Sequence, residues 1–204
     1  MNNDISNVSY PDFWNNCYNT EDTGWDLSAP TPIFVDWCNN IDKKNQSICV
    51  PGSGNGYDPL YFASKGHSVT AIDFADMPIS HLKEESKKNG LNLKAIKQDI
   101  FNLDLELNNT FDYIVEYTCY CAINPKMRRM YIDVMYDLLK EGGEFVGILL
   151  PLNKKESEGG PPFGVELNKT IDMLSEKFNL IESVQHHLSI EPRKGNEQFV
   201  RFIK

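Results

Sequence analysis

The sequence lacks long apolar runs and a basic leader. None of its hydrophobic stretches reaches the roughly 18 residues that a membrane-spanning helix needs. Its first ten residues, MNNDISNVSY, have neither the basic region nor the apolar segment of a secretory signal. We therefore expect a cytoplasmic protein with no membrane partner.

Clusters of basic residues are lacking too. The chain carries 20 Lys and Arg against 29 Asp and Glu, which gives a net charge of −9 at pH 7. The phosphates of a nucleic acid would be repelled by such a protein. No nucleic-acid partner is expected, and the acidic excess is attributed to solubility.

Disulfide and metal-binding patterns are also missing. The five cysteines are an odd number and are scattered, so they form no disulfide framework. Cys119 and Cys121 have no second pair at ligand spacing, which favours buried thiols over metal ligands, although they could line a pocket. His186 and His187 would point to opposite faces of a predicted strand. No metal site is expected.

What the sequence does contain is an alternation of short apolar strands with helices. Such an alternation implies right-handed crossovers and a parallel sheet. One predicted helix is expected to end at the Gly142–Gly143 pair. The predicted strands are Ser47–Pro51, Ser68–Asp73, Lys94–Gln98, Phe111–Tyr117 and Glu144–Leu150, and the predicted helices are Tyr57–Lys65, Met77–Asn89, Lys126–Leu139 and Val165–Lys177.

The last two predicted strands, Leu180–Ile190 and Gln198–Ile203, are separated by only a short loop. So short a connection makes an antiparallel hairpin and not a crossover. A parallel sheet that ends in an antiparallel hairpin is typical of Rossmann-like class I methyltransferases. The predicted fold is therefore α/β, with a mostly parallel seven-stranded sheet and helices on both of its faces.

The stretch VPGSGNGYD follows the first strand and places Gly52, Gly54 and Gly56 at its carboxyl end. Ligands of doubly wound sheets bind at such ends. A dinucleotide fingerprint would need glycine where Tyr57 stands, and no Gly-Lys-Ser/Thr follows for a P-loop. The turn therefore disfavours an NAD-dependent enzyme. It suits S-adenosylmethionine, which needs close backbone approach but has no phosphate.

Acidic residues end the next two strands. Asp73 could accept the two ribose hydroxyls of S-adenosylmethionine, and Asp99 could bind its adenine, with Ile100 and Phe101 lining the base. An Asp at a strand end is also a common turn former. The succession of these features at the ends of three strands is what favours the cofactor.

Longer motifs carry a family resemblance. FWNNCYNTEDTGWDLSAPTP, from Phe13 to Pro32, contains W-D-x-x-x-P-T-P and resembles the start of the thiopurine S-methyltransferase superfamily. FDYIVEYTCYCAINPKMR, GGPPFG and PRKGNEQF are similar to motifs of its thiol, thiocyanate and halide methyltransferases. The likeness runs from about residue 13 to the C-terminus.

The resemblance implies one methyltransferase domain over residues 1–204. Residues 1–40 would form an N-terminal lid segment over the cofactor, and residues 41–204 a core with a substrate loop at 153–164. A monomer is implied as well. The aromatic lid residues could instead only pack the lid onto the core. The cofactor contacts implied by the resemblance are Trp14, Tyr18, Trp25, Gly52, Gly54, Asp73, Asp99, Ile100 and Tyr117.

Methyl transfer from a sulfonium is an in-line displacement, and a soft nucleophile needs alignment and desolvation more than activation. Asp26 and Glu116 are candidate acceptors of a thiol proton, although capping explains Asp26 and a polar strand end explains Glu116 equally well. Arg193 is a candidate to meet an anionic substrate or to lock the hairpin. No catalytic triad or metal set is present in the sequence.

The acceptor pocket is predicted to include Tyr120, Pro162 and Phe163. Relatives that use small inorganic anions have tyrosine where this chain has Phe163, which favours a thiol or sulfide as the methyl acceptor. A halide or thiocyanate acceptor, a thiopurine or metalloid acceptor, and a non-catalytic module that binds S-adenosylmethionine remain alternatives.

Overall fold

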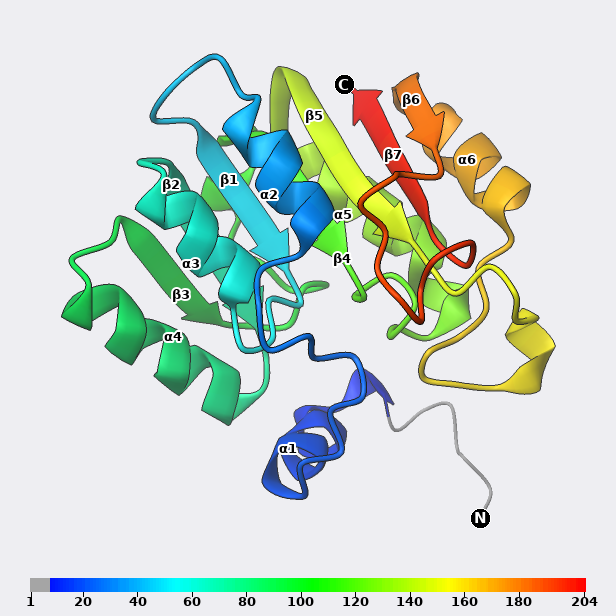
Figure 1. The fold of residues 1–204 in the computed structure, drawn as a ribbon, viewed down its shortest axis with the longest axis horizontal. Coiled ribbons are helices and arrows are strands. Elements are labelled where there is room, and N and C mark those ends of the chain that lie inside the picture. The colour runs from blue at the N-terminus through cyan, green and yellow to red at the C-terminus, as the bar shows by residue number, and fades with distance from the viewer. Residues whose placement is uncertain (1–7) are drawn as a thin grey trace.

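The computed structural model describes residues 8–204, so residues 1–7 of the predicted lid segment lie outside the described part. Seven strands form one sheet in the order β3-β2-β1-β4-β5-β7-β6 (Figure 1). The strands are β1 (Ser47–Pro51), β2 (Ser68–Asp73), β3 (Leu93–Lys97), β4 (Phe111–Tyr117), β5 (Leu139–Leu149), β6 (Asn179–Val184) and β7 (Gln198–Ile203).

The strands β1 to β5 run parallel to one another, whereas β7 runs antiparallel to both β5 and β6. The predicted sheet, mostly parallel with an antiparallel end, is thereby confirmed. The strand order reverses between β1 and β4, because the chain first builds outward to β3 and then returns to the other side of β1. Ligand sites of doubly wound sheets form beside that reversal.

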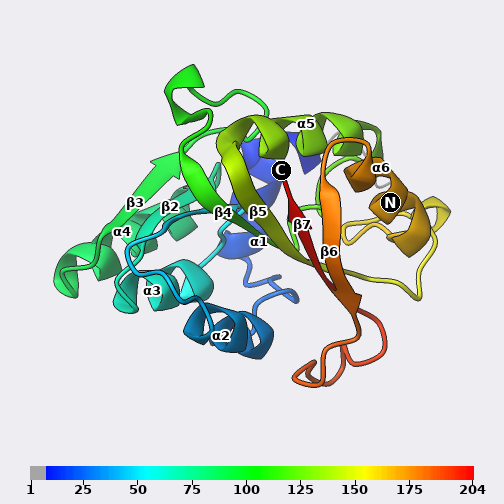
Figure 2. The same ribbon diagram turned by 90° about the horizontal axis from the view of Figure 1, so that it is seen from above.

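Helices cover both faces of the sheet. In Figure 2, α2 and α3 lie against one face, and α5 and α6 lie against the other. Three short 3₁₀ helices occur in the connections, at Leu105–Leu107, Pro125–Met127 and Glu156–Glu158. The α-helices are α1 (Pro11–Asn19), α2 (Pro32–Asn39), α3 (Tyr57–Ser64), α4 (Asp76–Lys88), α5 (Arg128–Leu138) and α6 (Leu167–Ser175). Among the described residues, none of the helices is long and apolar enough to cross a membrane.

The core follows from the alternation of side chains along each strand. On β4, Ile114 belongs to the cluster under α5 and α6, while Val115 belongs to the cluster under α2 and α3. Both side chains are fully buried. Successive residues of a strand point to opposite faces of the sheet. Adjacent apolar residues such as these two therefore contribute to both hydrophobic layers.

The Gly142–Gly143 pair does not end a helix, as the sequence predicted, but lies inside β5. The helix α5 ends at Leu138, and Leu139 already pairs with Phe111 of β4. The pairing then slips, so that Glu144 lies opposite Tyr113, and Gly142 takes a φ of 74° in the irregular stretch between. Glycine adopts this left-handed conformation without steric cost.

The strand β6 ends at Val184, earlier than the predicted Ile190. His186 and His187 therefore do not point to opposite faces of a strand, and the prediction was wrong. Their rings stack with centroids 4.7 Å apart, and His186 also packs against Phe199. The last pair between β6 and β7 joins Val184 to Phe199, and after it the chain leaves the sheet.

The first forty residues contain two helices that the sequence did not predict. The helix α2 packs into the core, where Phe34 and Trp37 join the cluster on the sheet face that α3 also covers. By contrast, α1 lies beyond the carboxyl ends of the parallel strands (Figure 1). Within the predicted lid segment, it is the part before α2 that reaches over the strand ends.

Candidate active site

A cavity of about 880 Å³ opens at the carboxyl ends of the parallel strands. Its wall comes from the segment before α2, the glycine turn after β1, the ends of β2 and β4, the loops after β3 and β5, and the loop before β7. Its volume lies within the roughly 300–1,000 Å³ of small-molecule sites. The predicted site residues in the wall are Trp14, Tyr18, Trp25, Asp26, Gly52, Gly54, Asp73, Asp99, Ile100, Phe101, Tyr117, Pro162 and Arg193.

The glycine turn needs its glycines for close approach as well as for conformation. Gly52, Gly54 and Gly56 have φ values of 58°, 52° and 78°, which side chains rarely allow. A Cβ on Gly52 would lie 2.8 Å from the Cβ of Cys119, and one on Gly56 would lie 2.1 Å from a methyl carbon of Leu82. The turn is thus pressed against the end of β4 and against α4, with Gly54 in the cavity wall.

Asp73 ends β2 beside this turn. Its Oδ2 accepts a hydrogen bond from the Gly54 amide at 2.9 Å, and its Oδ1 accepts one from the Ala75 amide at 2.9 Å. Burial raises the pKa of this carboxyl, and the amide hydrogen bonds oppose that rise. Each oxygen has a second lone pair, so the carboxylate can still accept two hydroxyl groups.

The loop after β3 forms the next part of the wall. The Oδ1 of Asp99 accepts a hydrogen bond from the Phe101 amide at 3.0 Å, which makes a local turn. Asp99 is therefore a turn former and a wall residue at once. Ile100 and Phe101 add apolar surface beside it.

The segment before α2 contributes three aromatic rings in contact. Trp25 packs edge to face against Trp14 and Tyr18, with centroids 5.6 and 5.9 Å apart. Burial raises the pKa of Tyr18, and the nearby carboxylate of Asp73 raises it further. The Oδ1 of Asn15 accepts a hydrogen bond from the Asp76 amide at 2.8 Å, which joins α1 to the start of α4. The rings both pack together and face the cavity.

Arg193, in the loop before β7, contacts two other segments of the cavity wall. Its Nη2 donates to the carbonyl oxygen of Trp25 at 2.8 Å, and its guanidinium lies 4.8 Å from the ring centre of Tyr117. Its buried Nη1 has no hydrogen-bond partner among residues 8–204. This nitrogen is itself shielded from solvent, whereas Arg193 as a residue forms part of the cavity wall.

Asp26 connects the aromatic segment to the glycine turn. Its Oδ1 accepts from the Ser28 amide at 2.6 Å, and its Oδ2 accepts from the side-chain amide of Asn55. Both oxygens are engaged in local contacts. The sequence allowed Asp26 to be either an acceptor of a thiol proton or a capping residue, and these contacts agree with the capping role.

Three predicted site residues do not line the cavity. Glu116 is 1% exposed and accepts hydrogen bonds from the Tyr120 amide at 2.7 Å and from the Tyr131 hydroxyl. Its burial raises its pKa to about 7. Tyr120 and Phe163 are also buried, in a layer behind the wall. The sequence identifies the strand end and the loop, but it does not say which side chains turn inward.

The sequence reasoning missed two features of the wall. Asp58 accepts hydrogen bonds from the amide and hydroxyl of Thr31, at 2.7 and 2.9 Å, and its burial raises its pKa to about 6. Thr118, after β4, has a φ of 64°, which is rare for a β-branched residue. The Thr in the P-T-P motif was a signal for the first feature, whereas nothing local in the sequence indicates the second.

Cys119 and Cys121 line the cavity. Burial raises the pKa of the Cys119 thiol well above its ordinary value and that of Cys121 to about 12. Both stay protonated near neutral pH, so neither is a good nucleophile or metal ligand. Across the part of the chain that the structure describes, no three His, Cys, Asp or Glu side chains gather as a metal site.

Comparisons with known proteins agree with this geometry. The family model described as Thiopurine S-methyltransferase (TPMT) matches residues 9–203. A probable thiol methyltransferase 2 of Arabidopsis thaliana is 31% identical, covering 94% of this chain and 84% of the relative. A thiocyanate methyltransferase 1 of Brassica oleracea is also 31% identical, with the same coverage of both chains.

Among solved structures, the 1,6-didemethyltoxoflavin-N1-methyltransferase of Burkholderia thailandensis, with bound S-adenosylhomocysteine, has a TM-score of 0.77. The match covers 100% of this chain and 90% of that one at 18% identity, so it shows the fold alone. The chain belongs to the thiopurine S-methyltransferase family and is an S-adenosylmethionine-dependent methyltransferase.

Proposed function

We propose that the enzyme transfers the methyl group of S-adenosylmethionine to a small thiol or sulfide and releases S-adenosylhomocysteine. Asp73 would accept both ribose hydroxyls, and Tyr117 would lie beside the methionine part. The adenine would lie against Ile100 and Phe101, beside Asp99. Trp14, Tyr18 and Trp25 would cover the sulfonium, which is a cation that aromatic faces attract.

The observation that supports this acceptor best is the composition of the wall between the end of β4 and the loop after β5. This part of the wall is apolar, and Arg193, which lines the same cavity and lies over the ring of Tyr117, supplies a cationic side chain. An apolar wall strips water from a thiolate, and a nearby guanidinium favours the anion over the thiol. The apolar wall residues here are Ala122, Ile123, Met127, Pro161 and Pro162.

In the reaction, a lone pair of the acceptor sulfur attacks the methyl carbon while the bond from that carbon to the sulfonium breaks. The protein's part is to align the two sulfur atoms and to exclude water. The thiol proton leaves to solvent before the attack, and no base is assigned. Glu116 does not line the cavity, and both oxygens of Asp26 are engaged.

An acceptor screen tests this function. Purified protein and S-adenosylmethionine are incubated with methanethiol, hydrogen sulfide, thiophenol, thiocyanate, iodide and 6-mercaptopurine, and the release of S-adenosylhomocysteine is measured. We expect the highest kcat/KM with one of the first three. Release at the level of the blank with every acceptor would contradict the proposal.

The pH dependence separates a thiol from an anionic acceptor. With a thiol, kcat/KM should rise about tenfold per pH unit below the pKa of the acceptor, because only the thiolate attacks. Thiocyanate stays ionised throughout, so its profile should lack this rise. Thiocyanate is the second candidate, since one relative with 31% identity is a thiocyanate methyltransferase.

A further inference from the structure

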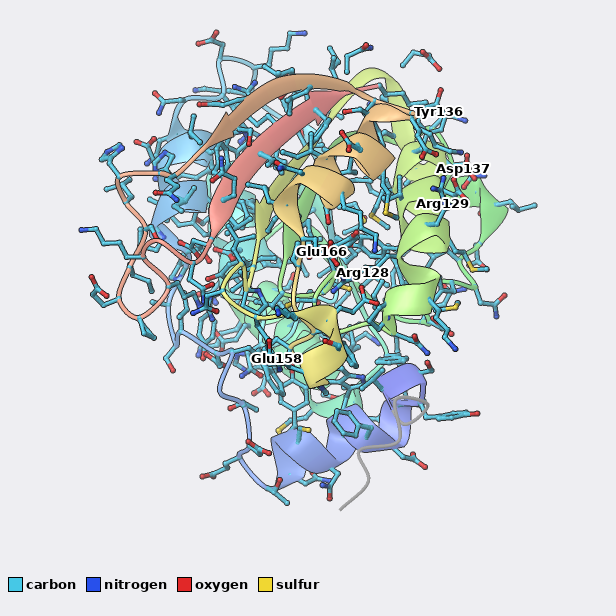
Figure 3. All side chains as sticks on the ribbon, turned by 90° about the vertical axis from the view of Figure 1, so that its right-hand side faces the viewer. Arg128, Arg129, Tyr136, Asp137, Glu158 and Glu166 are labelled. Atoms are coloured by element: carbon cyan, nitrogen blue, oxygen red, sulfur yellow. The ribbon has the colours of Figure 1, made fainter. Side chains whose placement is uncertain are left out.

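Arg128 begins α5 and is buried directly behind the loop that follows β5. Its Nη1 donates to the carbonyl oxygen of Gly164 at 3.0 Å, and its Nη2 donates to that of Phe163 at 3.3 Å. The residue is 5% exposed. In Figure 3, Arg128 lies on the side of α5 that faces the loop carrying Glu158. One planar group thus holds two successive carbonyls of this loop from inside the protein.

The same guanidinium makes two more contacts. Its centre lies 4.7 Å from the ring centre of Tyr120, which belongs to the turn after β4, and its Nη1 lies 3.3 Å from a carboxylate oxygen of Glu156. The turn and the loop are also joined directly, because the amide of Phe163 donates to the carbonyl oxygen of Cys121 at 2.7 Å. Arg128 therefore connects α5, the β4 turn and the loop.

Within residues 153–164 of this loop, the part that lines the cavity is the run Gly160–Pro161–Pro162. The run rests on the buried layer, since a Cβ on Gly160 would lie 2.6 Å from ring atoms of Phe163. Gly164 is packed more closely still, since a Cβ there would lie 2.1 Å from the carbonyl oxygen of Lys154. A loop packed this tightly can move only as a unit, so the carbonyls that Arg128 holds determine where the two prolines lie.

Burying a guanidinium is costly, and this one is not fully compensated. Its Nε has no hydrogen-bond partner in the described part of the chain, and Glu156, its only acidic partner there, has a side chain that is 40% exposed. An apolar side chain would fill the same space without the desolvation cost. What the apolar side chain could not do is fix the two carbonyl groups.

We propose that Arg128 is a positioning residue for the methyl acceptor: by holding the carbonyls of Phe163 and Gly164, it fixes the Pro161–Pro162 wall of the cavity. This inference rests on the proposed acceptor site. It assigns Arg128 to the acceptor half of the cavity, because the glycine turn and Asp73 are held by other contacts. Loss of Arg128 should therefore affect the acceptor and spare the donor.

The test compares Arg128→Met and Arg128→Lys with Arg129→Met. Arg129 is the matched control, since it is the next residue of α5 but is exposed and pairs with Glu176 at the surface. We expect the acceptor KM to rise about tenfold or more in Arg128→Met, because small misplacements of a reactant cost large factors in rate. The Kd for S-adenosylhomocysteine should change less than about twofold, as expected for a site held by separate contacts.

Hydrogen exchange gives a second readout that needs no acceptor. Peptides covering residues 153–164 should exchange faster in both Arg128 variants, whereas peptides covering the glycine turn should not, and Arg129→Met should match the wild type. If Arg128→Met fails to fold, Arg128→Lys decides, since it keeps the charge but cannot hold both carbonyls. If only the acceptor screen fails, the proposed function is wrong, but hydrogen exchange still tests whether Arg128 fixes the loop.

Two results would overturn the proposal. One is exchange in residues 153–164 and an acceptor KM that are the same in the Arg128 variants as in Arg129→Met. The other is a loss of S-adenosylhomocysteine affinity in parallel with the acceptor effect, which would mean that Arg128 supports the whole fold and not the acceptor wall.

Discussion

At the scale of single residues, Asp73 is a buried carboxylate whose orientation is fixed by the backbone. Two backbone amides hold it in place, one of them from the glycine turn. Its burial raises its pKa, yet the amides favour the ionised form that accepts hydroxyl groups best. The side chain is oriented before any ligand arrives.

We expect Asp73→Ala to weaken the binding of S-adenosylmethionine at least about tenfold, because hydrogen bonds to a charged group contribute roughly 1.5–3 kcal/mol. Isothermal titration gives the Kd, and circular dichroism checks that the variant is folded. Asp104→Ala is a suitable control, since Asp104 lies outside the cavity wall. An unchanged Kd in folded Asp73→Ala would mean that the ribose is held elsewhere.

Glu116 is a buried acid whose ordinary pKa of 4.5 is raised to about 7 by its burial. The folded state therefore binds its proton more tightly than the unfolded state does. The protonated form of Glu116 stabilises the folded protein, and this contribution is fully present at pH values below the pKa of Glu116 in the unfolded state. It is lost as the pH rises toward 7, where the folded protein must carry a buried charge.

Glu116→Gln stays neutral at every pH, so its stability relative to the wild type should increase between about pH 4.5 and pH 7 and then level off. The change corresponds to about 3 kcal/mol for a shift of this size. Urea unfolding of both proteins at pH 5, 6, 7 and 8 measures it. A difference that does not vary with pH would contradict this interpretation.

At the scale of elements, the segment before α2 has little apolar burial of its own and depends on ring contacts. Trp25 is the middle ring, in contact with Trp14 and Tyr18, and its carbonyl receives the hydrogen bond from Arg193. Elements with few buried contacts open at low free-energy cost. This segment is thus the element best placed to admit and release ligands.

Replacing Trp25 with Leu removes both ring contacts, each worth about 0.5–1.5 kcal/mol beyond its buried area. We expect S-adenosylhomocysteine to bind roughly tenfold more weakly, mainly through faster dissociation. Stopped-flow fluorescence measures the rate. Tyr10→Leu is the control, because Tyr10 belongs to the same segment before α2 but is 61% exposed. Equal dissociation rates for both variants would show that the ring cluster does not hold the ligand.

At the scale of the whole molecule, residues far apart in the sequence build one cavity. Val8 and Asn196 both line it, and the walls between them come from five strand ends and the segment before α2. A ligand that contacts walls from both ends of the chain binds only the folded state. Binding and folding are therefore linked.

We expect S-adenosylhomocysteine at 100 times its Kd to add about 2.7 kcal/mol to the free energy of unfolding. A thermal-shift titration should show one transition that moves upward with ligand, while NAD at the same concentration should leave it unchanged. An upward shift with NAD and none with S-adenosylhomocysteine would contradict the identification of the cofactor.

The sequence by itself determined the fold class and the order of the strands in the chain, and it identified most residues of the cavity wall at the strand ends. Strand periodicity, glycine conformation and the acids at strand ends are local properties, so β1, β2, β4 and β7 were predicted with the observed bounds. Trp14, Asp73 and Tyr117 line the cavity as the resemblance implied, while their contacts with the donor stay predictions.

Only the tertiary structure decided which side chains of the acceptor half turn inward. Glu116, Tyr120 and Phe163 stand beside wall residues in the sequence but lie behind them in space. Arg128 is unremarkable in the sequence, yet it holds two carbonyls some 35 residues further along the chain. Burial and long-range hydrogen bonds depend on how separate elements pack, and no local pattern encodes that packing.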